Sequence, residues 1–99
     1  MKIQHPDVRR IMAQTDNGKQ IFEHYKVPID TMITSPLNKY DSRCTFKVAY
    51  CDDSRKYKFT DSSSSTLYRE GDAIDFIMKL NYMSFRNAVQ KIVTDLKLK

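Results

Sequence analysis

Three lysines alternate with apolar side chains in the middle of the chain. Lys56 and Lys58 flank Tyr57, and Lys47 lies between Phe46 and Val48. Alternate side chains of an extended strand point to opposite faces, so this spacing predicts one lysine face and one apolar face. Ammonium groups spaced along a strand can bind successive phosphates, and exposed aromatic rings can stack on bases. The pattern therefore indicates a surface that could meet a nucleic acid.

Two arginines and two tyrosines extend this candidate surface. Arg43 and Arg55 lie near the ends of the predicted strands, where they would add phosphate contacts. Tyr40 and Tyr68 lie in predicted loops, where they would stack on bases. The lysines also have a simpler interpretation, the solvated side of a half-buried sheet, and the sequence leaves both open. The apolar members of the pattern are expected in the core: Phe46, Val48, Tyr50, Tyr57 and Phe59.

Three acidic residues, Glu70, Asp72 and Asp75, lie at the start of an apolar segment. Such a cluster is compatible with a metal or phosphoryl-transfer site. It also suits a helix start, because Asp is favoured at the N-cap and negative charge is stabilised in the first turn. We expect the cap. The serines at 62–65 lack a positioned base, and the chain shows no complete acid–base or metal constellation, so we expect no enzyme.

The two cysteines lie at the ends of an alternating segment. If residues 44–51 form a strand, seven steps of about 3.3 Å place Cys44 and Cys51 roughly 23 Å apart. A disulfide requires Cα atoms within about 7 Å, so we expect reduced thiols, as in the cytoplasm. The sequence shows neither a signal peptide nor the roughly 20 apolar residues of a membrane helix. It therefore predicts a cytoplasmic protein with no membrane contact.

The charge of the chain is concentrated in its middle third. The 99 residues are expected to form a single domain, 1–99, and 40% of them are hydrophobic, enough for a core. The chain has 17 basic and 12 acidic residues, a formal net charge of +5. Residues 31–60 hold six of the basic and three of the acidic groups. A polyanionic partner would therefore contact this part of the chain.

Periodicity predicts where the elements lie. Helical spacing predicts helix over 7–14, opened by Pro6, and over 19–26, ended by Val27 before Pro28. The turn or capping segment at 15–18 leaves open whether these are two short helices or one bent helix. Short strands are predicted at 32–34, 44–51 and 56–60, the last two as a hairpin, followed by a serine-rich loop over 61–66. Asp72 and Ser84 are predicted to cap helices at 73–80 and from 85 onwards. The fold class is α+β, a small antiparallel sheet (hairpin about 44–60) flanked by N-terminal and C-terminal helices.

Several of these segments resemble one known family. Residues 71–78 read Gly-Asp-Ala-Ile-Asp-Phe-Ile-Met and lead into the helix pattern that follows Ser84. This is similar to the end of the N-terminal zinc-binding domain of bacterial DNA primases. Upstream, Ser-Pro-Leu-Asn at 35–38 and Cys-Thr-Phe at 44–46 resemble the family's Cys-Pro-Phe-His followed by Pro-Ser-Phe. The resemblance covers residues 19–95 and implies a fold derived from a zinc ribbon, with a sheet that meets single-stranded template DNA.

The zinc ligands of that family are missing. The family holds zinc through Cys-x2-His and Cys-x2-Cys. The first pair falls on Ser35 and Asn38, and the second falls in residues 59–64, which offer only Phe, Thr, Asp and Ser. A serine hydroxyl is a poor zinc ligand beside thiolate or imidazole. We expect no zinc and no other cofactor, so that the fold depends on its apolar core.

Together these features predict a non-catalytic, primase-type domain that binds single-stranded DNA during replication of a chromosome, phage or mobile element. It would act alone or as the front part of a longer primase, with a replicative helicase or a primase catalytic domain as candidate protein partners. The alternative is a metal-free adaptor that contacts a replication partner through its C-terminal helices, which exposed Met83 or Leu98 would favour. The sequence does not distinguish DNA from RNA.

Overall fold

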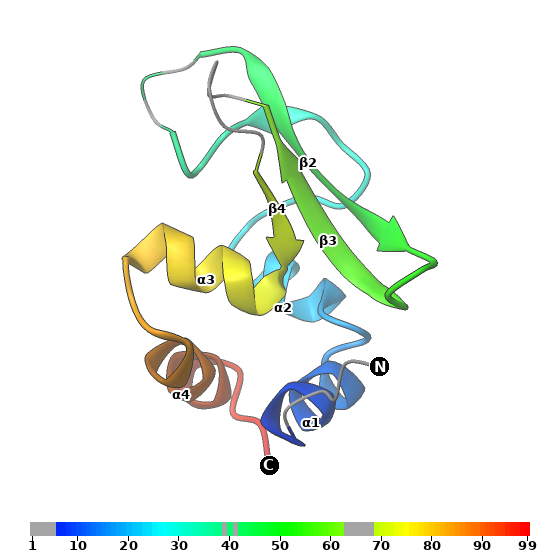
Figure 1. The fold of residues 1–99 in the computed structure, drawn as a ribbon, viewed down its shortest axis with the longest axis vertical. Coiled ribbons are helices and arrows are strands. Elements are labelled where there is room, and N and C mark those ends of the chain that lie inside the picture. The colour runs from blue at the N-terminus through cyan, green and yellow to red at the C-terminus, as the bar shows by residue number, and fades with distance from the viewer. Residues whose placement is uncertain (1–5, 39, 41, 63–68) are drawn as a thin grey trace.

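The computed structural model of the chain describes residues 6–38, 40, 42–62 and 69–99. Within these ranges two helices precede four strands, and two helices follow them (Figure 1). The elements are α1 (Pro6–Gln14), α2 (Lys19–His24), β1 (Ile33–Thr34), β2 (Cys44–Cys51), β3 (Lys56–Asp61), β4 (Arg69–Asp72), α3 (Ala73–Asn81) and α4 (Phe85–Asp95). The predicted α+β class, with helices on either side of an antiparallel sheet in the chain, is confirmed.

The sheet follows the chain strand by strand, in the order β1-β2-β3-β4, and every pair is antiparallel. The predicted hairpin forms its centre, where Ala49 of β2 lies opposite Lys58 of β3. β4 adds to the other side of β3, with Gly71 opposite Phe59. This strand was not predicted, because its charged residues and glycine have low strand propensity.

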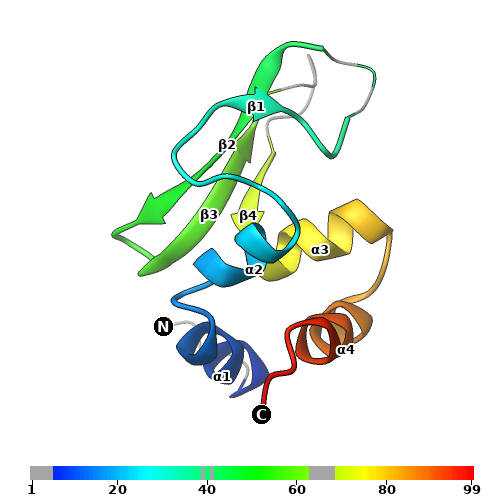
Figure 2. The ribbon, with the colours of Figure 1, turned by 180° about the vertical axis from the view of Figure 1, so that it is seen from behind.

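One face of the sheet is apolar and packs on helices. Phe46, Val48 and Phe59 are fully buried, which confirms their place in the core. The ring of Phe76 in α3 lies 5.6 Å from that of Phe46, 6.0 Å from that of Phe59 and 5.4 Å from that of Phe22 in α2. Both views show α2 and α3 next to the sheet and α1 and α4 beyond them (Figures 1 and 2).

The two remaining aromatic residues of the hairpin lie at the border of this core. Tyr50 and Tyr57 form a directly opposed pair with ring centroids 5.4 Å apart, and Tyr50 is 45% exposed. Their expected core role is therefore only partly met. Tyr57 is half-buried and packs against the core, whereas nearly half of Tyr50 is left exposed to solvent.

The second helix ends two residues earlier than predicted. The prediction extended it over 19–26, but α2 ends at His24. Lys26 has a left-handed φ of 65°, and the N–H of Val27 donates to the carbonyl of Phe22 at 2.9 Å. A left-handed residue that closes the last turn is a common helix ending, and the proline that follows Val27 rules out a further helical turn there.

A buried carboxylate fastens the start of the β1–β2 loop to the hairpin. Asp61 was predicted to begin a loop, but it ends β3 and has no exposed surface. The hydroxyl of Ser35 donates to it at 2.6 Å, and the hydroxyl of Thr45 donates at 3.3 Å. Ser35 also accepts from the N–H of Leu37 at 3.0 Å. These bonds hold the start of the β1–β2 loop against β2 and β3. The rest of the predicted serine-rich loop, residues 63–66, lies outside the described residues.

Polar contacts also fasten the last helix and the residues after it. The hydroxyl of Tyr25 donates to Asp95 at 2.8 Å, and Lys91 pairs with the same carboxylate at 2.9 Å. Partial burial and Asp95 raise the pKa of Tyr25, whereas the bonds from Lys91 and Tyr25 lower the pKa of Asp95. The side chain of Gln14 in α1 makes two hydrogen bonds to the backbone of Lys99, at 2.9 and 3.0 Å. Within the described ranges, none of the helices combines the length and the apolar character that crossing a bilayer requires.

The buried bond between Ser35 and Asp61 gives a first prediction. Ser35→Ala removes a donor from a buried carboxylate, and a hydrogen bond to a charged group contributes about 1.5–3 kcal/mol. We expect the free energy of unfolding, measured by urea denaturation, to fall by about that amount. Thr31→Ala is the matched control, because the hydroxyl of Thr31 makes an exposed bond to Ile29. Its effect should stay within about 0.5 kcal/mol, and equal effects of the two variants would contradict a structural role for the buried pair.

Candidate nucleic-acid interface

The three lysines lie on one face of the sheet, opposite the apolar face. In the observed register, Lys47 of β2 lies opposite Thr60, and Lys58 of β3 lies opposite Ala49. Lys56 precedes Lys58 by two residues and therefore points to the same side. We call this surface the lysine face; it comprises Lys47, Ala49, Cys51, Lys56, Lys58, Thr60, Glu70 and Asp72.

A shallow hollow of about 260 Å³ opens on this face. The residues that line it all belong to the strands β2, β3 and β4. They are Lys47, Ala49, Tyr50, Cys51, Lys58, Thr60 and Glu70. The aliphatic stems of two lysines and the small side chain of Ala49 contribute to its lining. Such a surface can accept an extended chain.

The three lysines differ in how they are paired. Lys58 lies 4.0 Å from Glu70, whose side chain is 57% exposed, and such an exposed pair is weak. Lys47 makes no ion pair with any residue that the structure describes. Lys56 is different, because it contacts Asp72 at 2.9 Å with both side chains less than one-fifth exposed. Lys47 and Lys58 can therefore meet an incoming anion, whereas Lys56 is already neutralised.

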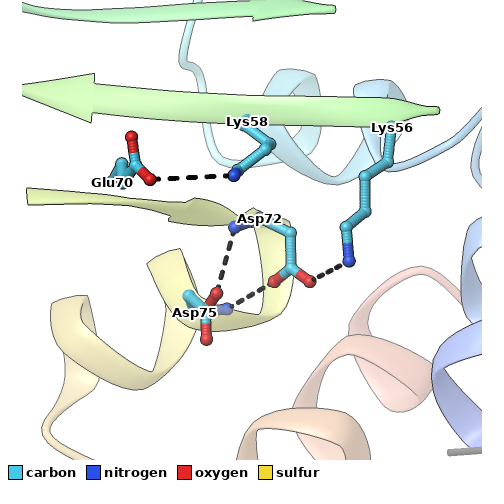
Figure 3. A network of polar contacts seen from close by, with 5 residues as sticks. All are labelled: Lys56, Lys58, Glu70, Asp72 and Asp75. Carbon is cyan, nitrogen blue, oxygen red and sulfur yellow. Dashed lines mark hydrogen bonds and ion pairs between the residues drawn. The ribbon is translucent and has the colours of Figure 1, made fainter. Parts of the chain in front are cut away.

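The carboxylate that pairs with Lys56 also starts α3 (Figure 3). Asp72 accepts from the N–H of Asp75 at 2.9 Å, and the carboxylate of Asp75 accepts from the N–H of Asp72 at 3.1 Å. This capping box satisfies two backbone donors at the helix start and confirms the predicted cap. A Cβ on Gly71 would lie 2.6 Å from the Cβ of Asp75, so only glycine fits before the cap. The acidic cluster is accounted for by the start of this helix.

The arginines and tyrosines named with the lysines are more widely spread. Arg43 is exposed just before β2, and Arg55 is exposed in the β2–β3 turn with a left-handed φ of 57°. They therefore lie beyond opposite ends of the hairpin. Tyr40 is wholly exposed in the β1–β2 loop. Tyr68 lies outside the described residues.

The two cysteines lie at the two ends of β2, Cys44 exposed and Cys51 half-buried on the lysine face. The neighbouring Ser54 lowers the pKa of the Cys51 thiol. The predicted strand that separates the two thiols is confirmed.

Sequence reasoning missed one exposed aromatic residue. Tyr82 follows α3 and is 94% exposed, with a left-handed φ of 52°. Together with Lys79 of α3 and Tyr40, it lines a second groove, of about 400 Å³. The signal available in the sequence was the position of Tyr82 just after the predicted helix, where glycine or asparagine is common. A large aromatic residue there is unusual.

The residues at the resembled zinc positions offer little to a metal. Ser35 bonds to Asp61, the sole carboxylate in 59–64, and Asn38 supplies only an amide. Zinc in a structural site takes four thiolate, imidazole or carboxylate ligands, and this donor set does not fit that requirement. The structure, over the residues it describes, brings together no group of three or more His, Cys, Asp and Glu that could hold a metal ion.

The chain matches no family model, no curated protein and no solved structure. What it binds is therefore inferred from its own surface. The lysine face offers two cations that can reach an anion and a hollow that both of them line. The aromatic core behind the sheet supports this face. This arrangement can bind an extended polyanion without covalent chemistry.

The capping box gives a pH-dependent prediction. Loss of hydration and the neighbouring Asp72 carboxylate raise the pKa of Asp75 above its usual 3.8. A carboxyl whose pKa is higher in the folded state contributes most below pH 3.8, and that contribution is lost as the pH rises through the folded pKa. Asp75→Asn removes this titration and keeps an acceptor oxygen. We expect the unfolding free energy of the variant, minus that of the parent, to grow as the pH rises above 3.8 and then level off.

This difference is measured by urea denaturation at a series of pH values, with far-UV circular dichroism to verify that α3 stays helical. A difference that shrinks as the pH rises above 3.8 would show that the ionised Asp75 carboxylate stabilises the cap, against the direction inferred here.

Proposed function

We propose that the chain is a non-catalytic domain that binds single-stranded nucleic acid, in the first place DNA, on its lysine face. The observation that carries the proposal is a four-stranded sheet with one face covered by helices and the other presenting Lys47 and Lys58 beside an open hollow. Binding is electrostatic in its main part, because the phosphates exchange their counterions for these ammonium groups.

The two lysines are placed to contact neighbouring phosphates. Lys47 and Lys58 are diagonal neighbours on adjacent strands, a relation that separates Cα atoms by about 7–8 Å. Glu70 forms only a weak, exposed ion pair with Lys58, so an incoming phosphate can displace the carboxylate. Arg43 and Arg55 extend the basic surface beyond the two ends of the hairpin. A nucleic-acid strand that runs along the hairpin therefore meets the lysine face and the basic residues near its ends.

Lys56 serves this surface in another way. Its pair with Asp72 joins β3 to the start of α3 and is mostly buried, so releasing it to a phosphate would leave a carboxylate without its cation. We assign Lys56 to holding the sheet on its helices. The lysine contacts to nucleic acid fall on Lys47 and Lys58.

The primase zinc-binding domain remains our proposal for the origin of the fold. Two contacts support it. The 71–78 run lies where β4 turns into α3, and its glycine and two aspartates build the cap. Ser35 and Asp61, from the two segments that would carry the family's ligand pairs, meet in a hydrogen bond of 2.6 Å. In this proposal a buried polar cluster takes the place of zinc, and the setting is DNA replication.

The adaptor alternative has less support on the surface of the protein. It would be favoured by exposed apolar side chains on the C-terminal helices. Met83 and Leu98 are half-buried and pack against the core. The test below addresses both ideas, because an adaptor would show no salt-dependent affinity for an oligonucleotide.

The double variant Lys47→Gln with Lys58→Gln tests the lysine face. Binding of a labelled single-stranded oligonucleotide is followed by fluorescence anisotropy between about 50 and 200 mM salt. Each lost phosphate contact lowers the slope of log affinity against log salt by roughly 0.7, so the double variant should lose roughly 1.4 from the slope. The control is Arg86→Gln with Lys99→Gln, which removes the same charge from the helical side of the molecule.

The control should keep the parent's slope to within a few tenths. If the slope falls by the same amount in both double variants, binding depends on net charge rather than on the lysine face. If the parent protein binds no single-stranded oligonucleotide at low salt, the proposed function is wrong.

A chelator tests the metal-free fold. The donors around Ser35 and Asp61 do not suit zinc, so an excess of EDTA should leave the thermal unfolding midpoint of the untagged protein unchanged. A structural zinc ion contributes directly to folding, and its removal would lower the midpoint sharply. Such a drop, restored by added zinc, would contradict the proposal.

A further inference from the structure

A second groove lies at the end of the sheet away from the β2–β3 turn. It runs between the β1–β2 loop and the C-terminal end of α3, which approach each other in both views (Figures 1 and 2). Its volume is about 400 Å³, and it is lined by Pro36, Leu37, Asn38, Tyr40, Lys79, Leu80 and Tyr82. None of these lining residues belongs to the lysine face, so the groove is a separate site.

Tyr82 forms one wall of the groove in an unfavourable backbone state. Its φ of 52° is left-handed, and its N–H donates to the carbonyl of Met78 to close α3. Glycine or asparagine adopts this conformation more readily. The side chain is 94% exposed, so it gains little from packing in return. A tyrosine that neither suits its backbone nor packs is free to contact a ligand.

Tyr40 lines the same groove from the β1–β2 loop, whose start is anchored by the buried bond between Ser35 and Asp61. Tyr40 is wholly exposed, and its N–H donates to the side-chain oxygen of Asn38 at 3.2 Å. The loop that carries both residues is anchored by Ser35 on Asp61. Two tyrosines therefore line one groove, Tyr40 from the β1–β2 loop and Tyr82 from the end of α3.

The chemistry of the lining selects the occupant. Pro36, Leu37 and Leu80 contribute apolar side chains to the lining, while Lys79 and Asn38 add a cation and an amide. Among the described residues that line the groove, none is acidic. The volume lies at the small end of the range for ligand sites, which suits one nucleoside-sized group. A flat ring that carries a phosphate matches an aromatic wall beside an ammonium group.

We propose that this groove binds one base of a single-stranded nucleic acid. The base stacks on Tyr82, Tyr40 closes the other side, and Lys79 contacts an adjoining phosphate. This site deepens the proposed function and rests on it: the lysine face supplies charge, and the tyrosine groove supplies an affinity for bases. The domain then distinguishes a strand with unpaired bases from a bare polyanion.

The test separates bases from phosphates. A ten-nucleotide oligothymidylate and an abasic strand of equal length and charge are titrated by anisotropy against the parent protein and Tyr82→Asn. One base–aromatic stack corresponds to roughly a 5-fold to 150-fold change in affinity. We expect the parent to prefer the thymidylate by at least that lower factor, and the variant to lose most of the preference while its affinity for the abasic strand stays unchanged.

Asparagine tolerates the left-handed conformation, so Tyr82→Asn should keep or raise the thermal midpoint, which separates lost stacking from lost folding. Tyr40→Ser, on the facing wall, should also weaken the preference. Met32→Asn is the control, because Met32 is half exposed and does not line the groove. Its preference for thymidylate should match the parent's.

The outcomes distinguish this inference from the function on which it rests. If the parent binds both strands equally, or if Tyr82→Asn keeps the full preference, the groove does not bind a base. The proposal that the lysine face binds nucleic acid would be unaffected, because it is tested separately by the salt dependence of binding. If the parent binds neither strand at low salt, both the groove and the proposed function are wrong.

Discussion

A carboxylate with no access to water sets the strictest constraint in this molecule. Desolvating a charge is costly unless hydrogen bonds replace its hydration, so Asp61 must be met by donors wherever it is buried. Ser35 and Thr45 meet it from the β1–β2 loop and from β2. These two bonds hold the start of the β1–β2 loop against the hairpin, and Leu37 of the same loop packs against the apolar core.

A second carboxylate divides the lysines into two kinds. Asp72 is an N-cap, a member of a capping box and the partner of Lys56 at the same time (Figure 3). Lys56 therefore belongs to the joint between sheet and helix, although it shares a face with Lys47 and Lys58. Residues of one type at one spacing can thus differ in their availability to a ligand. The difference comes from β4, which places Asp72 firmly against Lys56 but gives Lys58 only the exposed Glu70.

Much of the fold could be predicted from the sequence, because it follows local rules. Alternation revealed the hairpin, the apolar stripe revealed α4, and Gly71 with Asp72 marked the start of α3. Features decided by tertiary contacts were missed. β4 is short and charged, and it forms because β3 offers it a partner. Asp61 resembled a loop residue, since only the fold shows which hydroxyls surround it.

The candidate site was predictable to a similar degree. The common face of the lysines follows from the pleat, but their pairing depends on β4. Tyr40 could be proposed from its type and its loop, whereas Tyr82 looked like an ordinary residue after a helix. Its importance emerges only when its backbone angle, its exposure and its neighbour Lys79 are seen together.

The strand order has a further consequence, for the way in which the chain reaches this structure. Each strand pairs with its neighbour in sequence, and α3 begins where β4 ends. Most of the sheet can therefore assemble by successive short-range closures, beginning at the four-residue turn between β2 and β3, without waiting for distant segments to meet. Low contact order of this kind favours rapid folding. The contact between α1 and α4 is the exception, because it joins the first and the last helix of the described chain.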